Sequence, residues 1–175
     1  MRFKPVPEPP DDLAFVDTVR RSVPETAGTV DDCCAHLLAE TALETRDEAA
    51  TWLTFLRALE LAAEEPAGYR RRGPAPDEGA GTPLKRDRLR RTFRERVDGA
   101  AAVLATLEDA ERPLTAARVA DALHETQSDG ERRARRTRVE EDRIERLLEW
   151  AVLLGLAERT ENGAGYRLTR GREER

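Results

Sequence analysis

The stretch that decides the fold is LLEWAVLLGLAERTENGAGYRLT, which runs from Leu147 to Thr169. Its first half carries apolar residues at the spacing of an amphipathic helix. Gly155 then suits the left-handed position at which many helices end. Two short alternating runs follow, and Asn162-Gly163 between them favours a β-hairpin because both residues tolerate positive φ. The stretch therefore predicts a helix followed directly by a hairpin.

A shorter version of the same pattern, WLTFLRALELAAEEPAGYRR, stands earlier in the chain. Residues 52–62 align with residues 147–157 at an offset of 95. The start of the second hairpin strand, residues 68–70, aligns with residues 165–167 at an offset of 97. Upstream, residues 29–41 align with residues 114–126 at an offset of 85. Such self-similarity predicts an internal repeat. The change of offset places extra residues of the second copy after Thr126 and makes its hairpin longer. In the first copy, Pro66-Ala67-Gly68 predicts a tighter turn.

Each copy predicts a helix, a short helix, a longer helix and a hairpin. In the second copy Thr115 can cap a short helix that carries Val119 and Leu123 at i, i+4 spacing. The longer helix has one apolar stripe, formed by Ile144, Leu147, Leu148 and Ala151. Tyr69 and Tyr166 occupy equivalent positions, where we expect them to pack each hairpin onto its helices.

This order of three helices and a C-terminal hairpin resembles the winged helix-turn-helix superfamily. The resemblance covers residues 11–72 and roughly 97–170. It implies a mainly α fold with small β-hairpins, in which tandem winged helix-turn-helix units are joined by a linker and a long helix. The hairpin of such a unit is called the wing.

The expected organisation follows the resemblance and the composition. We expect a flexible N-terminal segment at 1–10, an acidic winged-helix-like unit at 11–72, a Gly- and Pro-rich linker at 73–83, a long helix plus the second winged-helix unit at 84–170, and a flexible tail at 171–175. Thr82-Pro83 suits a helix start. The first half of the long helix would pack on the first unit or pair with a second chain. We favour pairing, and thus a homodimer through residues 84–110.

Charge is high but nearly balanced, with a net of -5. Lys4 and Lys85 are the only lysines, so 28 of the 30 basic residues are Arg. This composition is typical of GC-rich genomes and salt-adapted organisms, and we expect a prokaryotic source. Residues 1–69 hold 6 basic and 14 acidic residues, against 24 and 21 in the remainder. Arginine is concentrated in residues 70–96 and in RRARRTR (132–138), which we expect to lie in a loop before the third helix.

Two interpretations of the second arginine run stay open. The run either lies against phosphates or forms a solvated face that pairs with the carboxylates around it. Asp142, Glu145 and Glu149 surround Arg146 on the outward face of the third helix, which disfavours base reading in the major groove. We therefore expect mainly phosphate-backbone contacts, made by the arginine-rich loop, the wing and the long helix that bridges the two units. The candidate residues are Arg132, Arg133, Arg135, Arg136, Arg138, Arg146, Arg159, Asn162, Arg167, Arg88 and Arg91.

The sequence gives little support for a catalytic site or a metal site. Cys33, Cys34 and His36 suggest a metal site, but adjacent helical residues point about 100° apart and structural zinc takes four ligands. We expect these cysteines to be structural and His124 to cap a helix or face solvent. No phosphate-cradling glycine loop or nucleophile elbow is present. We therefore expect no metal, no cofactor and no enzymatic activity. The chain has no apolar run of about 20 residues, and we expect a cytoplasmic protein.

The leading hypothesis is a DNA-binding regulatory or chromatin-associated protein. Its second unit and arginine-rich segments would contact double-stranded DNA, and its acidic first unit would bind a protein partner. The alternative is a protein-interaction scaffold built from tandem winged-helix units, as in segregation-and-condensation or endosomal sorting complexes. The net negative charge and the acidic third helix favour this alternative.

Overall fold

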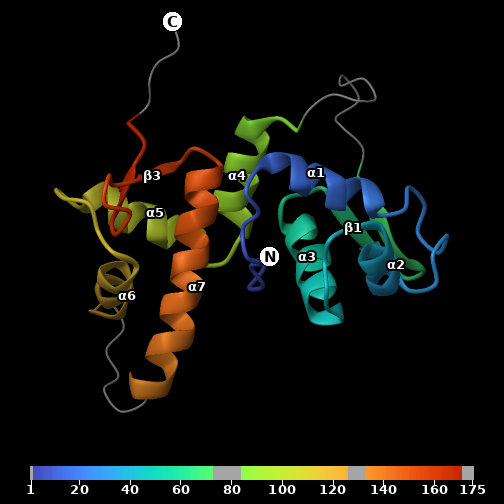
Figure 1. Cartoon of the computed structure of the whole chain (residues 1–175), viewed down its shortest axis with the longest axis horizontal. Helices are drawn as coiled ribbons and strands as arrows, with labels where there is room; N and C mark the ends of the chain where they lie inside the picture. Colours follow the sequence, from blue (N-terminus) through green and yellow to red (C-terminus); the bar gives the residue numbers. More distant parts are fainter. Residues whose placement is uncertain (1, 73–83, 126–132, 171–175) are drawn as a thin grey trace, which may run out of the picture. The chain divides into compact units, whose positions relative to one another are not determined.

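The chain folds into two compact units, Met1–Asp98 and Gly99–Arg175, which we call unit 1 and unit 2. The structure is a computed structural model that describes residues 2–72, 84–125 and 133–170 (Figure 1). In the helix that begins at Arg133, side chains are described from Arg138 onward. Each unit has three helices followed by a two-stranded antiparallel sheet. The predicted repeat and the mainly α fold class with small hairpins are therefore confirmed.

Unit 1 carries one helix after its hairpin. Its elements are α1 (Leu13–Ser22), α2 (Cys33–Glu40), α3 (Arg46–Ala58), β1 (Ala62–Glu65), β2 (Gly68–Arg71) and α4 (Arg86–Arg96). Local sequence explains the helix starts, because Asp12 and Asp32 accept hydrogen bonds from the first-turn amides and Thr45 forms a capping box with Glu48. The wing register runs from Ala62–Arg71 to Glu65–Gly68, so the tight turn predicted after Glu65 is confirmed.

Unit 2 repeats this order with a longer third helix. Its elements are α5 (Ala100–Asp109), α6 (Ala116–Glu125), α7 (Arg133–Leu153), β3 (Ala157–Arg159) and β4 (Tyr166–Leu168). Thr115 Oγ1 accepts a hydrogen bond from the Arg118 amide at 3.2 Å, as its predicted capping role requires. Leu114 and Tyr166 exchange two backbone hydrogen bonds of 2.9 and 2.8 Å. The segment before α6 therefore joins the wing through an isolated antiparallel bridge.

The third helix of both units ends in the same way. In unit 2 Gly155 has φ +73, and the Leu156 amide donates to the Ala151 carbonyl at 2.8 Å. In unit 1 Glu60 takes the equivalent place with φ +60, and the Leu61 amide donates to the Leu56 carbonyl at 2.8 Å. These are Schellman-type helix ends, and the left-handed residue in them is usually glycine. Unit 1 thus has a strained glutamate where unit 2 has glycine.

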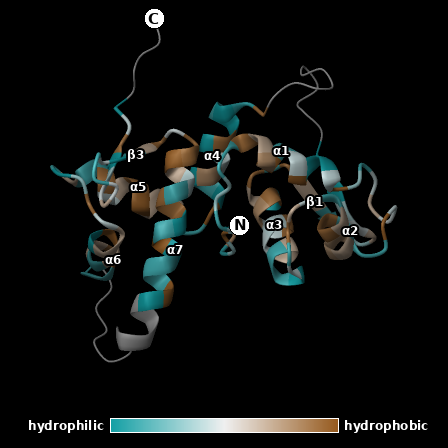
Figure 2. Cartoon of the chain, viewed as in Figure 1, coloured by the Kyte–Doolittle hydropathy of each residue, from teal (hydrophilic) through white to brown (hydrophobic). Residues whose placement is uncertain are grey.

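Each unit has its own aromatic and aliphatic core. In unit 2 the predicted stripe of Ile144, Leu147, Leu148 and Ala151 is buried, with at most 7% of any side chain exposed. In unit 1 Trp52 lies edge-on to Phe15 and Phe55, with ring centroids 5.5 and 6.2 Å apart. Hydrophobic and hydrophilic residues accordingly alternate around α3 and α7 in Figure 2. Edge-on aromatic pairs contribute about 0.5–1.5 kcal/mol beyond their buried area.

The single long helix predicted for 84–110 is wrong. The chain forms two helices, α4 and α5, separated at residues 97–99. Gly99 has φ +83, which a continuing right-handed helix does not allow. Leu89 and Phe93 of α4 are buried within unit 1, so the apolar face that was expected to pair with a second chain is already covered. The division between Asp98 and Gly99 also differs from the predicted boundary, because α4 belongs to unit 1.

The flexible segment predicted at 1–10 is also wrong for its described residues. Phe3 and Val6 are buried, at 7% and 5% exposure. The Phe3 amide donates to the Arg96 carbonyl at 2.7 Å, and the Asp98 amide donates to the Phe3 carbonyl at 2.9 Å. The segment thus forms a parallel bridge with Val97. Apolar residues among the prolines give it a face that unit 1 buries.

Three predictions fall on parts of the chain that are outside the described residues. These are the linker at 73–83, the helix start at Thr82-Pro83 and the tail at 171–175. Among the described helices, none combines the length and the apolar character that crossing a bilayer demands.

Candidate nucleic-acid interface

The arginine run before the third helix of unit 2 is helical where the structure describes it. α7 begins at Arg133, so residues 133–138 form its first turns and the expected loop is wrong for them. Alanine and arginine are good helix formers, which explains the extension. With 21 residues, α7 is about 31 Å long. Arg133, Arg135 and Arg136 therefore lie on this helix, whereas Arg132 lies outside the described residues.

The outward face of α7 mixes arginines with carboxylates. Arg138 and Arg146 are exposed, as are Asp142 and Glu145. Neither arginine has an ion-pair partner within the described part of the chain. Ile144, Leu147 and Leu148 hold the opposite face in the core. Arg138 and Arg146 are eight residues apart, so about 12 Å along the helix axis separates them.

Glu149 differs from its predicted position on the outward face. Its side chain is only 18% exposed, and its carboxylate makes an ion pair with Arg159 of β3. The same carboxylate accepts a hydrogen bond from the Tyr166 hydroxyl of β4. Burial and this hydrogen bond raise the pKa of Tyr166 well above its usual range, and Glu149 likewise raises the pKa of Arg159. Both strands of the wing are thereby attached to α7 through one carboxylate, whose charge is compensated.

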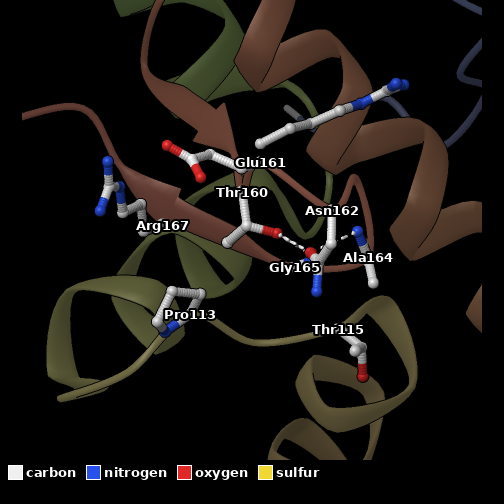
Figure 3. A pocket seen from close by; sticks show the side chains of 9 residues that line it. Pro113, Thr115, Thr160, Glu161, Asn162, Ala164, Gly165 and Arg167 are labelled. Atoms are coloured by element: carbon white, nitrogen blue, oxygen red, sulfur yellow. Dashed lines mark hydrogen bonds between the residues drawn. The ribbon is translucent and has the colours of Figure 1, made fainter.

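The wing loop is organised around Asn162. Its Oδ1 accepts hydrogen bonds from the Thr160 hydroxyl at 2.6 Å and from the Ala164 amide at 3.2 Å (Figure 3). Gly163 has φ +69, while Asn162 does not have positive φ, so the turn differs from a two-residue Asn-Gly hairpin. Asn162 therefore shapes the wing tip with its carbonyl oxygen.

An open pocket of about 620 Å³ lies beside this loop. The wing contributes residues such as Thr160 and Arg167, and the segment that leads into α6 contributes Pro113 and Thr115 (Figure 3). Arg167 Nε lies 2.5 Å from Glu158 Oε1, yet its side chain remains 61% exposed. The wing therefore presents hydroxyl, amide and guanidinium groups to solvent, all within unit 2.

The remaining two candidate residues lie on α4 of unit 1. Arg88 is 28% exposed and its nitrogen lies 3.7 Å from a Glu60 oxygen, so it serves mainly to attach α4 to the end of α3. Arg91 is exposed. The structure thus gathers Arg138, Arg146, Arg159, Asn162 and Arg167 on the third helix and wing of unit 2. It places Arg88 and Arg91 in the other unit.

The cysteines and histidines have local structural surroundings. Cys33 and Cys34 are half-buried free thiols, and burial raises the pKa of Cys34. His124 Nε2 lies 2.9 Å from Glu140 Oε2, which links α6 to α7. Across residues 2–72, 84–125 and 133–170, no three His, Cys, Asp or Glu side chains are arranged to hold a metal ion.

Sequence reasoning missed the partners that position these elements. Glu149 was assigned to an outward face, Glu60 was not singled out, and Phe3 was placed in a flexible segment. The repeat itself holds a signal for Glu60, because it aligns with Gly155 at the offset of 95. A glutamate at a position that favours glycine indicates a side chain with a role. No comparable signal exists for Glu149, since its partners lie ten and seventeen residues away on strands.

Comparison with known proteins supports the fold assignment. The family model that matches is described as "Halobacterial double winged helix domain" and covers residues 1–171. No curated protein and no solved structure gave a match. The family match covers almost the whole chain and agrees with the two units described above. Winged-helix folds of this kind are typical of DNA-binding regulators and are typically non-enzymatic. The chain therefore belongs to the halobacterial double winged helix domain family.

Proposed function

We propose that the protein is a DNA-binding regulatory or chromatin-associated protein whose unit 2 contacts the phosphate backbone of double-stranded DNA. The contacting elements are the outward face of α7, through Arg138 and Arg146, and the wing, through Arg167 and the loop at Asn162. Arg132, Arg133, Arg135 and Arg136 remain further candidates by sequence, and their side chains lie outside the described part of the chain. Such a protein would regulate transcription of the genes next to the DNA that it binds.

One observation carries the proposal: α7 and the wing both remain open to solvent while Glu149 is neutralised between them. Arg159 and the Tyr166 hydroxyl occupy the carboxylate that would otherwise repel phosphates. The exposed arginines then lie on two elements that Glu149 joins through an ion pair and a hydrogen bond. Fixing binding groups in place before the ligand arrives reduces the entropic cost of binding.

The proposal also predicts a limited ability to read sequence. Asp142 and Glu145 stay exposed beside Arg146. Carboxylates accept hydrogen bonds from cytosine but repel the phosphates that flank the groove. Binding through arginine and phosphate is sensitive to salt and weakly dependent on base sequence.

A salt titration tests the proposal. Fluorescence anisotropy of a labelled duplex is measured with the full chain in monovalent salt from about 0.1 to 1 M, since charges are screened beyond about 3 Å at the upper limit. Each neutralised phosphate contributes about -0.9 to the slope of log K against log salt. Replacing Arg138, Arg146 and Arg167 by Gln should make the slope less steep by roughly 3.

The control variant removes the same charge from unit 1. Arg21, Arg46 and Arg70 are replaced by Gln, and this variant should bind like the native chain. Circular dichroism at each salt concentration confirms that the proteins are folded. Absence of binding at low salt, or equal loss in both variants, would overturn the proposal.

The competing function is a protein-interaction scaffold that does not bind DNA directly. The net charge of -5 and the exposed Asp142 and Glu145 on α7 favour it. In that case the acidic unit 1 binds a protein partner, and affinity purification after nuclease treatment retains that partner. If the chain does not bind the duplex in the anisotropy experiment but retains a stoichiometric protein partner after nuclease treatment, it is an interaction scaffold.

A further inference from the structure

The elements of unit 1 that correspond to a DNA-reading surface have their arginines paired internally. Arg46 at the start of α3 lies 2.9 Å from Asp32 and thereby lowers the pKa of that carboxyl. The wing repeats this arrangement, because Arg70 pairs with Glu65 and Arg71 pairs with Glu25. Arginines paired in this way have less to gain from a phosphate, since each must first give up its carboxylate.

The outward face of α3 is also covered. Every side chain from Thr51 to Ala58 is buried or half-buried. Arg57 pairs with Glu64 at 2.5 Å, and its guanidinium lies 5.2 Å from the centre of the Phe3 ring. Arg96 of α4 lies 5.4 Å from the same ring. A helix in the major groove must offer exposed side chains to base edges. In α3 the exposed side chains are those of Arg46, Asp47, Glu48 and Ala50, near its N-terminal end.

α4 shows the opposite arrangement. Leu89, Thr92 and Phe93 are at most 2% exposed and hold one face of the helix in unit 1. At its C-terminal end Arg96 lies 2.6 Å from Glu60, the strained residue that ends α3. The helix is therefore firmly held, and its other face is directed to solvent.

That other face carries more exposed arginines than exposed carboxylates. Arg86, Arg91 and Arg94 are exposed, and none has a carboxylate partner among the residues that the structure describes. Two carboxylates are also exposed on this helix. Asp87 lies 3.3 Å from Arg90, so its charge is partly compensated, and Glu95 follows Arg94. Arg86 and Arg94 are eight residues, or about 12 Å, apart along the helix axis. A DNA duplex of that length carries about seven phosphates.

We propose that unit 1 contacts the DNA backbone through Arg86, Arg91 and Arg94 of α4, and not through α3 or its wing. This inference rests on the proposed function, because the ligand is the duplex that unit 2 binds. Linking two modules converts the second contact into an intramolecular one and raises the overall affinity. The partner of this surface is therefore double-stranded DNA, contacted through its phosphates without regard to base sequence.

The test compares two variants of the full chain with equal net charge. In the first, Arg91 and Arg94 are replaced by Gln; in the second, Arg46 and Arg70 are replaced by Gln. All four side chains lie in unit 1, and circular dichroism checks that both variants fold. Anisotropy of a labelled duplex is measured across the salt series, and the duplex is long enough for both units, about 30 base pairs.

The two proposals fail in different ways. Loss of Arg91 and Arg94 should make the salt slope less steep by about 2 and weaken binding at low salt by at least tenfold, while the Arg46 and Arg70 variant matches the native chain. If the native chain binds but the first variant keeps the native slope, or the second loses as much, α4 is not a contact surface. If the native chain does not bind at all, the proposed function itself is wrong, and this inference with it.

Discussion

Glu60 and Gly155 show how a single residue differs between two copies of one fold. Both end the third helix with positive φ, a conformation that costs a residue other than glycine about 1 kcal/mol or more. Glu60 offsets this cost through Arg96 and Arg88, which attach α4 to unit 1. Unit 2 has no such helix after its wing in the described residues, and there glycine suffices.

Replacing Gly155 by Ala should destabilise unit 2 by about 1 kcal/mol, because alanine is strained at positive φ. The measurement is urea unfolding of a protein in which Trp52 is replaced by Phe. Trp150 is then the single tryptophan, and its fluorescence reports on the unfolding of unit 2. Unfolding of unit 1, read from Trp52 in the reciprocal protein, serves as the control. An unchanged midpoint for unit 2 would contradict this account of the helix end.

Glu60 also predicts a pH dependence for unit 1. The Arg96 side chain lowers the pKa of Glu60 from its ordinary value of 4.5. A lowered folded-state pKa means that the stabilisation is complete above pH 4.5 and is lost as the pH falls through the folded-state value. The difference in unfolding free energy between the native chain and the Glu60→Gln variant should therefore shrink in acid. A difference that stays constant from pH 7 to about pH 3 would show that the ion pair does not stabilise the fold.

At the scale of elements, the wing of unit 2 is attached at two edges. Leu114 pairs with the Tyr166 backbone on one edge, and Glu149 binds the Tyr166 hydroxyl and Arg159. Hydrogen bonds to charged groups contribute about 1.5–3 kcal/mol. Tyr166 takes part in both attachments, through its backbone and through its hydroxyl.

Replacing Tyr166 by Phe should loosen the wing while leaving the helices folded. The lost hydrogen bond should lower the free energy of opening the hairpin by about 1.5 kcal/mol. The backbone amides of Thr160 and Thr169, which close the hairpin, should then exchange roughly tenfold faster. Amide hydrogen exchange followed by NMR measures this change. Tyr69→Phe in unit 1 is the matched control and should leave these amides unaffected. Exchange that stays at the native rate in Tyr166→Phe would show that the hydrogen bond from the Tyr166 hydroxyl to Glu149 does not stabilise the wing.

Sequence predicts elements better than it predicts their partners. The apolar stripe of α7, the Thr115 cap and the two hairpins follow from local spacing, and the structure confirms them. The break between α4 and α5 could not be predicted from spacing, because apolar residues keep their helical period from Leu89 through Val97 to Leu104. A backbone pairing between Val97 and the distant Phe3 ends the helix there. The same limit applies to charges, since sequence places Glu149 near arginines but does not identify Arg159 as its partner.

At the scale of the whole molecule, the division at Asp98 and Gly99 makes α4 part of unit 1. Fragment 1–98 should therefore be more stable than fragment 1–72 by at least about 3 kcal/mol, because the shorter fragment loses the buried side chains of Leu89 and Phe93. Trp52 fluorescence in urea measures both fragments. Equal midpoints would mean that α4 does not belong to the core of unit 1.

The central claim is that the third helix and wing of unit 2 form the surface that meets DNA. Amide chemical shifts of the full chain, recorded by NMR while a duplex is added at low salt, test this claim most directly. The account predicts that the largest shifts occur on α7 from Arg138 to Arg146 and in the wing from Asn162 to Arg167. No shifts at all, or shifts confined to α2 and α3 of unit 1, would contradict it.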